Sequence, residues 1–182
     1  NKDVQVVVVT PDAALGKKAV ACPVIYLLHG YGGNAKTWIG VKPDLPQIAD
    51  EKGIIFVCPD GKNSWYWDSP KDPSYRYETF VSSELVKYID GHYKTIADRK
   101  GRAITGLSMG GHGAMWNAIR HKDTFGAGGS TSGGVDIRPF PLNWDMSKQL
   151  GEFAYNKKVW DEHTVINQID KIENGDLAII ID

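Results

Sequence analysis

The segment Gly106-Leu107-Ser108-Met109-Gly110 holds a serine between two glycines in the pattern G-x-S-x-G. The pattern carries chemistry only when it follows a buried strand and opens a helix, because a tight turn then keeps the serine hydroxyl exposed. The flanking sequence meets this condition, since residues 102–105 read as a strand and residues 109–121 as a helix. A side chain at either glycine would collide with the neighbouring turn. Ser108 is therefore the predicted nucleophile, and the alternative is a glycine-rich turn with an incidental serine.

An activated serine also needs an oxyanion hole, a general base and a group that orients the base. The run His29-Gly30-Tyr31-Gly32-Gly33 follows an apolar strand predicted at 23–28, where a loop can bring backbone N–H groups beside the serine. The predicted oxyanion-hole donors are the backbone amides of Tyr31 and Met109. Loss of one such donor typically costs about 3–4 kcal/mol of transition-state stabilisation.

None of the five histidines is well placed to act as the base. His112 lies one turn inside the helix that the serine opens, and a helix N-terminus disfavours the imidazolium that a base must become. We expect His112 to pack against the sheet or a loop, and His29 to hydrogen-bond within its own loop. His92 and His121 are expected in solvated or C-terminal positions of helices. His163 is expected at the surface, with a substrate-side position as the alternative.

The composition predicts a single domain over residues 1–182, with 42% apolar residues and a formal net charge of −1. Because no basic or acidic block occurs, nucleic acid is excluded as the main partner, and so is an anionic membrane surface. No apolar run reaches the length of a membrane span, and cytoplasmic and secreted or periplasmic locations both fit. Cys22 and Cys58 are expected to be free, since strand rise separates them by roughly 15–20 Å.

Strand-like and helix-like patterns alternate along the chain. Apolar strand patterns lie at 5–10, 23–28, 53–58, 102–105, 125–132 and 176–181. Asp44 and Ser74 are expected to cap two further helices, and the second has Tyr88 on its inward face. The alternation predicts an α/β fold with a mostly parallel sheet and helices on both faces. The pattern weakens at about 135–174, where we expect a cap-like excursion.

The combined motifs resemble the putative-esterase family of α/β hydrolases. This family includes esterase D (S-formylglutathione hydrolase), tributyrin esterases, feruloyl and acetyl-xylan esterases, and the mycolyltransferases. The matching segments are residues 26–33, 57–61, 63–66 and 106–114, and the likeness extends over essentially the whole chain. The resemblance implies the α/β-hydrolase fold, Ser108 as the acyl-accepting nucleophile, and the Tyr31 and Met109 amides as the oxyanion hole.

The resemblance also implies the chain order serine, acid, histidine. The acid and the histidine would then lie beyond Asp182, so we expect a hydrolase domain truncated after the strand that ends at this residue. The alternative is that Asp182 is itself the triad acid, since it stands at the C-terminal tip of that strand.

Several aromatic residues are predicted on the rim near the serine. Trp65 and Tyr66 follow the end of the strand at 53–58, and Trp38 follows the oxyanion loop. Their planar side chains suit sugar rings or an aromatic acyl group, so these three are the predicted substrate-binding residues. The alternative is that they cover the core beneath the loop. Of the other tryptophans, Trp116 is expected in the core, whereas Trp144 and Trp160 could line the cap.

The predicted function is a serine carboxylesterase that hydrolyses short acyl esters, including acyl groups on carbohydrate, through an acyl-enzyme on Ser108. No metal or organic cofactor is expected. One alternative is an acyltransferase or an S-formylglutathione-type thioesterase on the same fold. A second is a catalytically incomplete fragment or a binding module. The predicted partner is a small-molecule or carbohydrate ester. Formation of a homo-oligomer stays open, because a chain ending at Asp182 would expose one edge of the sheet.

Overall fold

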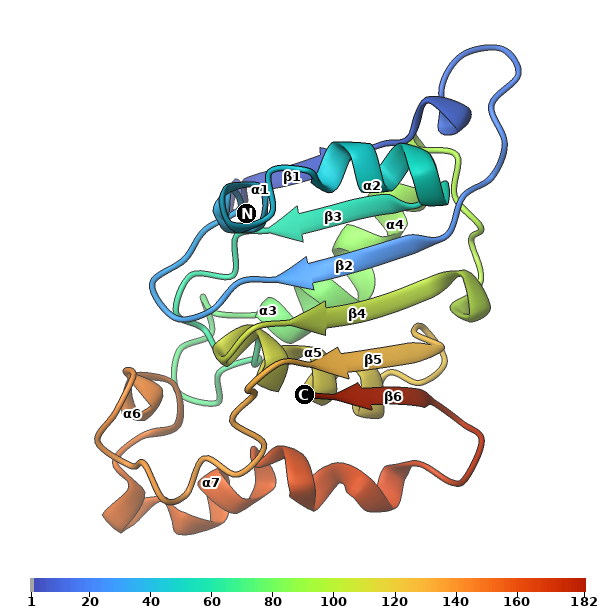
Figure 1. The fold of residues 1–182 in the computed structure, drawn as a ribbon. Coiled ribbons are helices and arrows are strands. Elements are labelled where there is room, and N and C mark those ends of the chain that lie inside the picture. The colour runs from blue at the N-terminus through green and yellow to red at the C-terminus, as the bar shows by residue number, and fades with distance from the viewer. Residues whose placement is uncertain (1) are drawn as a thin grey trace.

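The computed structural model describes residues 2–182 and contains a six-stranded sheet in the order β1-β3-β2-β4-β5-β6 (Figure 1). Strand β1 is antiparallel to β3, and the other four pairings are parallel. The mostly parallel sheet predicted from the sequence is confirmed. The strands are Val6–Val9 (β1), Val24–Leu28 (β2), Ile55–Pro59 (β3), Arg102–Gly106 (β4), Ala127–Ser130 (β5) and Ala178–Ile181 (β6).

Helices cover both faces of this sheet, because alternate side chains of the buried strands point in opposite directions. In β2, Tyr26 and Leu28 pack into one apolar cluster and Leu27 packs into another. Figure 1 shows α2 on one face and α4 and α5 on the other. The α-helices are Thr37–Val41 (α1), Leu45–Lys52 (α2), Tyr77–Thr79 (α3), Leu85–His92 (α4), Met109–Arg120 (α5), Met146–Leu150 (α6) and Lys157–Glu162 (α7).

The two predicted helix caps differ from expectation. Asp44 occupies the N-cap position of α2, but its side chain makes no capping hydrogen bond and pairs with Lys42 at 2.8 Å. Ser74 is not an N-cap. It lies in a turn closed by Asp72, and α3 begins at Tyr77. Helix α3 continues through a π-helical turn at Phe80–Glu84 into α4. Tyr88 lies on the side of α4 that faces β1, as predicted, but it is 55% exposed and therefore not buried.

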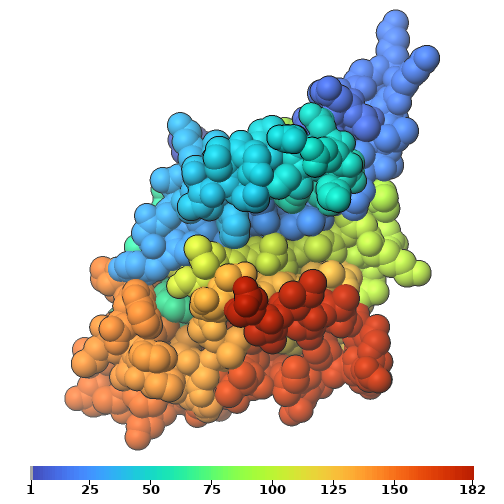
Figure 2. Space-filling view, viewed as in Figure 1, coloured from blue at the N-terminus to red at the C-terminus, as the bar shows by residue number. Residues whose placement is uncertain are grey.

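Strand β6 forms one edge of the sheet and pairs only with β5 among residues 2–182. Its sequence is as apolar as that of the buried strands, yet all four residues are exposed, with Ile180 at 76%. Figure 2 shows this last segment, in dark red, lying on the visible surface. The difference arises because an edge strand has a neighbour on one side only, so apolar side chains alone do not bury it.

The segment from Val135 to Asn174 contains no strand and consists of short helices and loops. Helices α6 and α7 alternate there with 3₁₀ turns at Phe153–Tyr155 and Val165–Lys171; further 3₁₀ turns lie at Asp12–Ala14 and Arg99–Gly101. Hydrogen bonds join this segment to the loops at the carboxyl ends of the parallel strands, and two of them come from the loop after β3. Trp65 Nε1 donates to the Trp144 carbonyl, and Ser69 Oγ donates to the Gln149 carbonyl. The segment thus lies beside the edge of the sheet where β4 delivers Ser108.

Candidate active site

Ser108 lies at the turn between β4 and α5 with φ +56° and ψ −116°, a strained conformation for a residue with a side chain. Two hydrogen bonds hold the turn. The Ser108 amide donates to the Thr131 carbonyl at 2.9 Å, and the Leu107 amide donates to the Leu28 carbonyl at 3.3 Å. The Ser108 residue is exposed, and within residues 2–182 its hydroxyl has no hydrogen-bond partner. The turn therefore presents an uncommitted hydroxyl at the carboxyl edge of the sheet.

The two glycines of the motif allow β4, α5 and β2 to approach closely. A Cβ on Gly106 would lie 2.8 Å from the Leu28 carbonyl oxygen, and a Cβ on Gly110 would lie 2.7 Å from the His29 carbonyl oxygen. Both obstacles are backbone atoms, which cannot rotate away as a side chain can. The spacing of the motif is thus a packing requirement as well as a chemical one.

Replacement of Gly110 by alanine is expected to lower the free energy of unfolding by about 3 kcal/mol, because the new methyl group would overlap the backbone of β2. Urea denaturation followed by circular dichroism measures this loss. The matched control is Gly91→Ala in α4, where nothing lies within 4 Å of the new Cβ. The control should be neutral or stabilising by up to about 1 kcal/mol. Equal midpoints for the two variants would contradict the packing argument.

The loop after β2 lies directly against the Ser108 turn. A Cβ on Gly30 would be 3.6 Å from Ser108 Cβ and 3.3 Å from the Leu107 carbonyl oxygen. His29 restrains this loop through two hydrogen bonds. Its Nδ1 donates to the Gly30 carbonyl at 2.7 Å, and its Nε2 accepts from the Gly61 amide at 2.9 Å. Burial lowers the pKa of His29 despite Asp60 nearby, so the ring is neutral. The predicted structural role of His29 within its loop is confirmed.

The amides of Tyr31 and Met109 are both available as donors. Within residues 2–182 neither amide donates to another protein group. Met109 is the first residue of α5, where amides have no partner inside the helix and the helix dipole favours negative charge. The loop after β2 and the start of α5 thus each contribute one N–H group that has no partner among residues 2–182.

Ser108 opens onto a cavity of about 240 Å³. Three of the predicted site residues, Tyr31, Trp65 and Ser108, line it together. The remaining lining residues come from the loop after β5 and from the start of α6: Ser132, Gly133, Gly134, Asp136, Ile137, Phe140, Trp144 and Met146. Most of this wall is apolar or aromatic, with Ser132 and Asp136 as polar groups. The cavity could receive a small apolar or aromatic group attached to a polar one.

Two predicted substrate-binding residues do not reach this cavity. Tyr66 is fully buried, and its hydroxyl donates to the His29 carbonyl at 3.0 Å. Trp38 packs against the opposite face of the sheet, where its Nε1 donates to the Leu28 carbonyl at 3.0 Å. Both side chains pack below the loop that follows β2, which agrees with the alternative that these aromatics cover the core. Of the three predicted aromatics, only Trp65 lies at the cavity.

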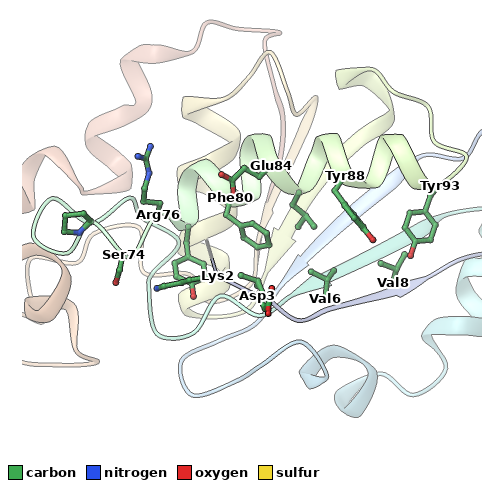
Figure 3. A pocket seen from close by; sticks show the side chains of 14 residues that line it. Lys2, Asp3, Val6, Val8, Ser74, Arg76, Phe80, Glu84, Tyr88 and Tyr93 are labelled. Atoms are coloured by element: carbon green, nitrogen blue, oxygen red, sulfur yellow. The ribbon is translucent and has the colours of Figure 1, made fainter.

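A larger cavity, of about 1110 Å³, lies elsewhere (Figure 3). It runs between β1 and the helical stretch from α3 to α4, with Val6 and Val8 facing Phe80 and Tyr88. None of the predicted site residues lines it, so size alone does not identify the site.

His112 and His163 belong to an aromatic cluster behind the cavity. His112 is fully buried, its Nδ1 donates to the Gly134 carbonyl at 3.0 Å, and its ring contacts Trp65 and Trp67 edge-on. Burial lowers the pKa of His112 to about 4, so the ring is neutral at pH 7. His163 stacks on Trp116 and is half-buried, which makes its expected surface position wrong. Burial lowers the pKa of His163 as well.

The remaining histidines also have local partners. His121 binds the buried carboxylate of Glu78 at 2.8 Å, a contact that its predicted solvated position did not include. His92 is exposed, stacks on Tyr88 and bonds to the Tyr88 carbonyl. Within residues 2–182 no histidine hydrogen-bonds to Ser108. Asp182 bonds through its backbone to the β5 side of the sheet and does not line the cavity.

Sequence reasoning missed the residues that follow β5. Ser132 and Asp136 lie just beyond a strand whose carboxyl end meets that of β4, which is a signal that could have identified them. Trp144 was expected only as a residue that could line the cap, and Asp145 had no signal, since nothing in the sequence indicates which part of a loop folds back. Both cysteines are free and buried, as expected.

Within residues 2–182, no three side chains of histidine, cysteine, aspartate or glutamate cluster closely enough to hold a metal ion. In the same range, no helix is both long enough and apolar enough to cross a lipid bilayer.

The amino-acid sequence is similar to those of several known esterases and hydrolases. An esterase of Mycobacterium tuberculosis is 28% identical over 178 residues, covering 87% of this chain and 38% of that protein. The S-formylglutathione hydrolase of Bos taurus is 25% identical over 194 residues, covering 94% of this chain and 65% of that protein. The chain thus spans 38% to 65% of the length of these relatives.

Solved structures show the same fold. A fluorophosphonate-binding serine hydrolase of Staphylococcus aureus superposes with a TM-score of 0.81 at 19% identity, over 97% of this chain and 72% of that one. Its likeness supports the α/β-hydrolase fold expected from the sequence. The model of the Esterase family, described as "Putative esterase", matches residues 1–181. Since that match leaves out only the last residue, the chain belongs to the putative-esterase family, and the resemblance seen in its motifs is confirmed.

Proposed function

We propose that this chain acts as a serine carboxylesterase on short acyl esters, with Ser108 as the nucleophile. The observation that carries the proposal is the exposed Ser108, held at a positive φ between β4 and α5, at a cavity that Tyr31 also lines. In the proposed reaction, Ser108 Oγ attacks the ester carbonyl, the alcohol leaves, and water then releases the acid from the acyl-enzyme. The family match and the hydrolase names of the relatives support this class of reaction.

The proposed oxyanion hole consists of the Tyr31 and Met109 amides. The start of α5 adds a favourable dipole for the negative charge that develops on the carbonyl oxygen. A serine base and its orienting acid are still needed, and both stay predictions. Within residues 2–182 the histidine rings are engaged with other groups.

The aromatic wall of the cavity supports an acyl or alcohol group with a flat apolar part. Trp65, Phe140 and Trp144 supply that wall, while Ser132 and Asp136 offer polar contacts to a hydroxylated portion. An acyl group on a carbohydrate fits this mixture. Thioester hydrolysis and transfer to an acceptor other than water remain the alternative activities, since both would use the same acyl-enzyme.

Covalent labelling tests the proposal directly. A fluorophosphonate should modify one residue of the folded chain, and peptide mass spectrometry should locate the adduct on Ser108. Hydrolysis of p-nitrophenyl acetate and butyrate, with and without an added alcohol acceptor, then separates hydrolysis from acyl transfer. A folded chain that neither takes up the label nor releases p-nitrophenol would contradict the proposed function.

A further inference from the structure

The dipeptide Trp144-Asp145 has an unusual backbone. Both residues have a left-handed conformation, with φ +51° at Trp144 and φ +57° at Asp145, although neither is glycine. Such a conformation is costly for a residue with a Cβ and persists where the surroundings hold it in place. The dipeptide immediately precedes α6, and Trp144 forms part of the cavity wall.

Contacts from both sides of the cavity hold this dipeptide. Trp65 Nε1 donates to the Trp144 carbonyl at 3.0 Å, and the Trp144 ring packs against Phe140 and Trp65 at centroid distances of 5.5 Å and 6.3 Å. The Tyr31 hydroxyl donates to Asp145 Oδ2 at 2.8 Å, across 114 residues of sequence. The second carboxylate oxygen, Oδ1, pairs with Lys148 at 3.1 Å.

The hydroxyl of Tyr31 therefore connects the 135–174 segment to the loop that lies against Ser108. Within residues 2–182 it is the one hydrogen bond that the Tyr31 side chain makes, and the residue is 40% exposed. The next amide in the loop, that of Gly32, donates to Asn63 Oδ1 at 2.8 Å. Two hydrogen bonds therefore restrain the backbone at Tyr31: the neighbouring Gly32 amide binds Asn63, and the Tyr31 side chain binds Asp145.

We propose that Asp145 is a positioning residue, which acts through Tyr31 to fix the loop amide beside Ser108 and to keep Trp144 across the cavity. The inference rests on the proposed function, because the Tyr31 amide matters only if Ser108 attacks a carbonyl. We call the Tyr31–Asp145 hydrogen bond, together with the Trp144-Asp145 dipeptide, the latch. The pKa shifts agree with a charged acceptor. The hydrogen bond to Asp145 raises the pKa of Tyr31, and the same bond lowers the pKa of Asp145.

Hydrogen exchange tests the coupling without any need for activity. Tyr31→Phe should speed exchange roughly fivefold in a peptide spanning residues 143–150, and Asp145→Ala should do the same in a peptide spanning residues 29–34. The double variant should exchange no faster than either single variant. Lys148→Ala is the matched control, since it removes the partner of Oδ1 and leaves the Tyr31 bond intact. If each substitution left the exchange rate of the peptide on the opposite side of the cavity unchanged, the proposed coupling through the latch would be wrong.

Labelling kinetics test the positioning role. With a fluorophosphonate at increasing concentration, Asp145→Ala should lower the limiting rate of Ser108 modification about tenfold, with little change in the half-saturating concentration. Asp145→Asn keeps an acceptor oxygen and should recover most of that rate. An unchanged limiting rate in Asp145→Ala, with Ser108 still labelled, would overturn the positioning role. Failure of the wild-type chain to label would instead count against the proposed function, while hydrogen exchange still decides the coupling.

Discussion

Replacement of Ser108 by alanine is expected to abolish fluorophosphonate labelling and to remove the serine-dependent part of p-nitrophenyl butyrate hydrolysis, because no covalent adduct can then form. The backbone of the turn should survive, since alanine keeps the Cβ and loses only the hydroxyl. Steady-state kinetics at pH 7 measure the loss, and circular dichroism checks that the variant is folded.

Ser132→Ala is the matched control for this prediction. Ser132 lines the same cavity, is exposed, and also has a left-handed backbone with φ +50°. It lies after β5 in a loop rather than between a strand and the start of a helix, so it lacks the dipole of α5. Ser132→Ala should keep most of the activity. If Ser132→Ala were inactive and Ser108→Ala active, the nucleophile would be assigned to the wrong serine.

The second large effect concerns the buried carboxylate of Glu78, which joins α3 to the C-terminal half of α5. Glu78 is 8% exposed and accepts three hydrogen bonds, from Trp116 Nε1 at 2.9 Å, Arg120 Nε at 2.8 Å and His121 Nε2 at 2.8 Å. Arg120 also stacks on the Trp116 ring and donates to Gln168. The carboxylate thus joins α3, α5 and the 3₁₀ turn that follows α7.

Glu78→Gln is expected to lower the free energy of unfolding at pH 7 by about 3 kcal/mol, since it removes the charge that pairs with Arg120 and His121. The figure lies at the low end for a buried pair, because both partner side chains are about one-third exposed and partly screened by water. Urea denaturation measures the loss. Glu84→Gln is the control, since Glu84 is exposed on the same helical stretch, and it should change stability by less than about 0.5 kcal/mol.

The same carboxylate predicts a pH dependence. Burial alone raises the pKa of Glu78, but the hydrogen bonds from His121 and Arg120 outweigh it and lower the pKa from 4.5 to about 2. A group whose pKa falls on folding stabilises the protein above the unfolded pKa and loses that contribution as pH falls through the folded value. The gap between wild type and Glu78→Gln should therefore be full above pH 5 and shrink steadily toward pH 2. A gap that stayed constant over that range would contradict the assignment.

Much of the fold and the position of Ser108 could be predicted because they depend on local sequence. Strand positions follow from continuous apolar runs, and the turn at Ser108 follows from two glycines at fixed spacing around it. The loop after β2 could be placed beside that turn because parallel strands deliver their carboxyl ends to one edge of the sheet. These inferences needed no knowledge of which distant residues would meet.

The predictions that the structure did not bear out depend on side-chain direction and on contacts between residues far apart in the sequence. Trp65 and Tyr66 are neighbours in sequence, yet one lines the cavity and the other is buried beneath His29. The apolar pattern of β6 does not distinguish it from the buried strands, because burial depends on what packs against a strand, and its isoleucines are exposed at the edge of the sheet.

By itself, the sequence determined the α/β alternation, the strained serine turn and the glycine loop beside it, because each depends on residues close together in the chain. Only the tertiary structure decided which aromatic side chains surround Ser108, how Glu78 engages three donors, and that Tyr31 meets Asp145. Those contacts join residues 38 to 114 positions apart, and their formation depends on how the helices and the 135–174 segment pack. Packing of that kind is a property of the whole chain, which no local pattern encodes.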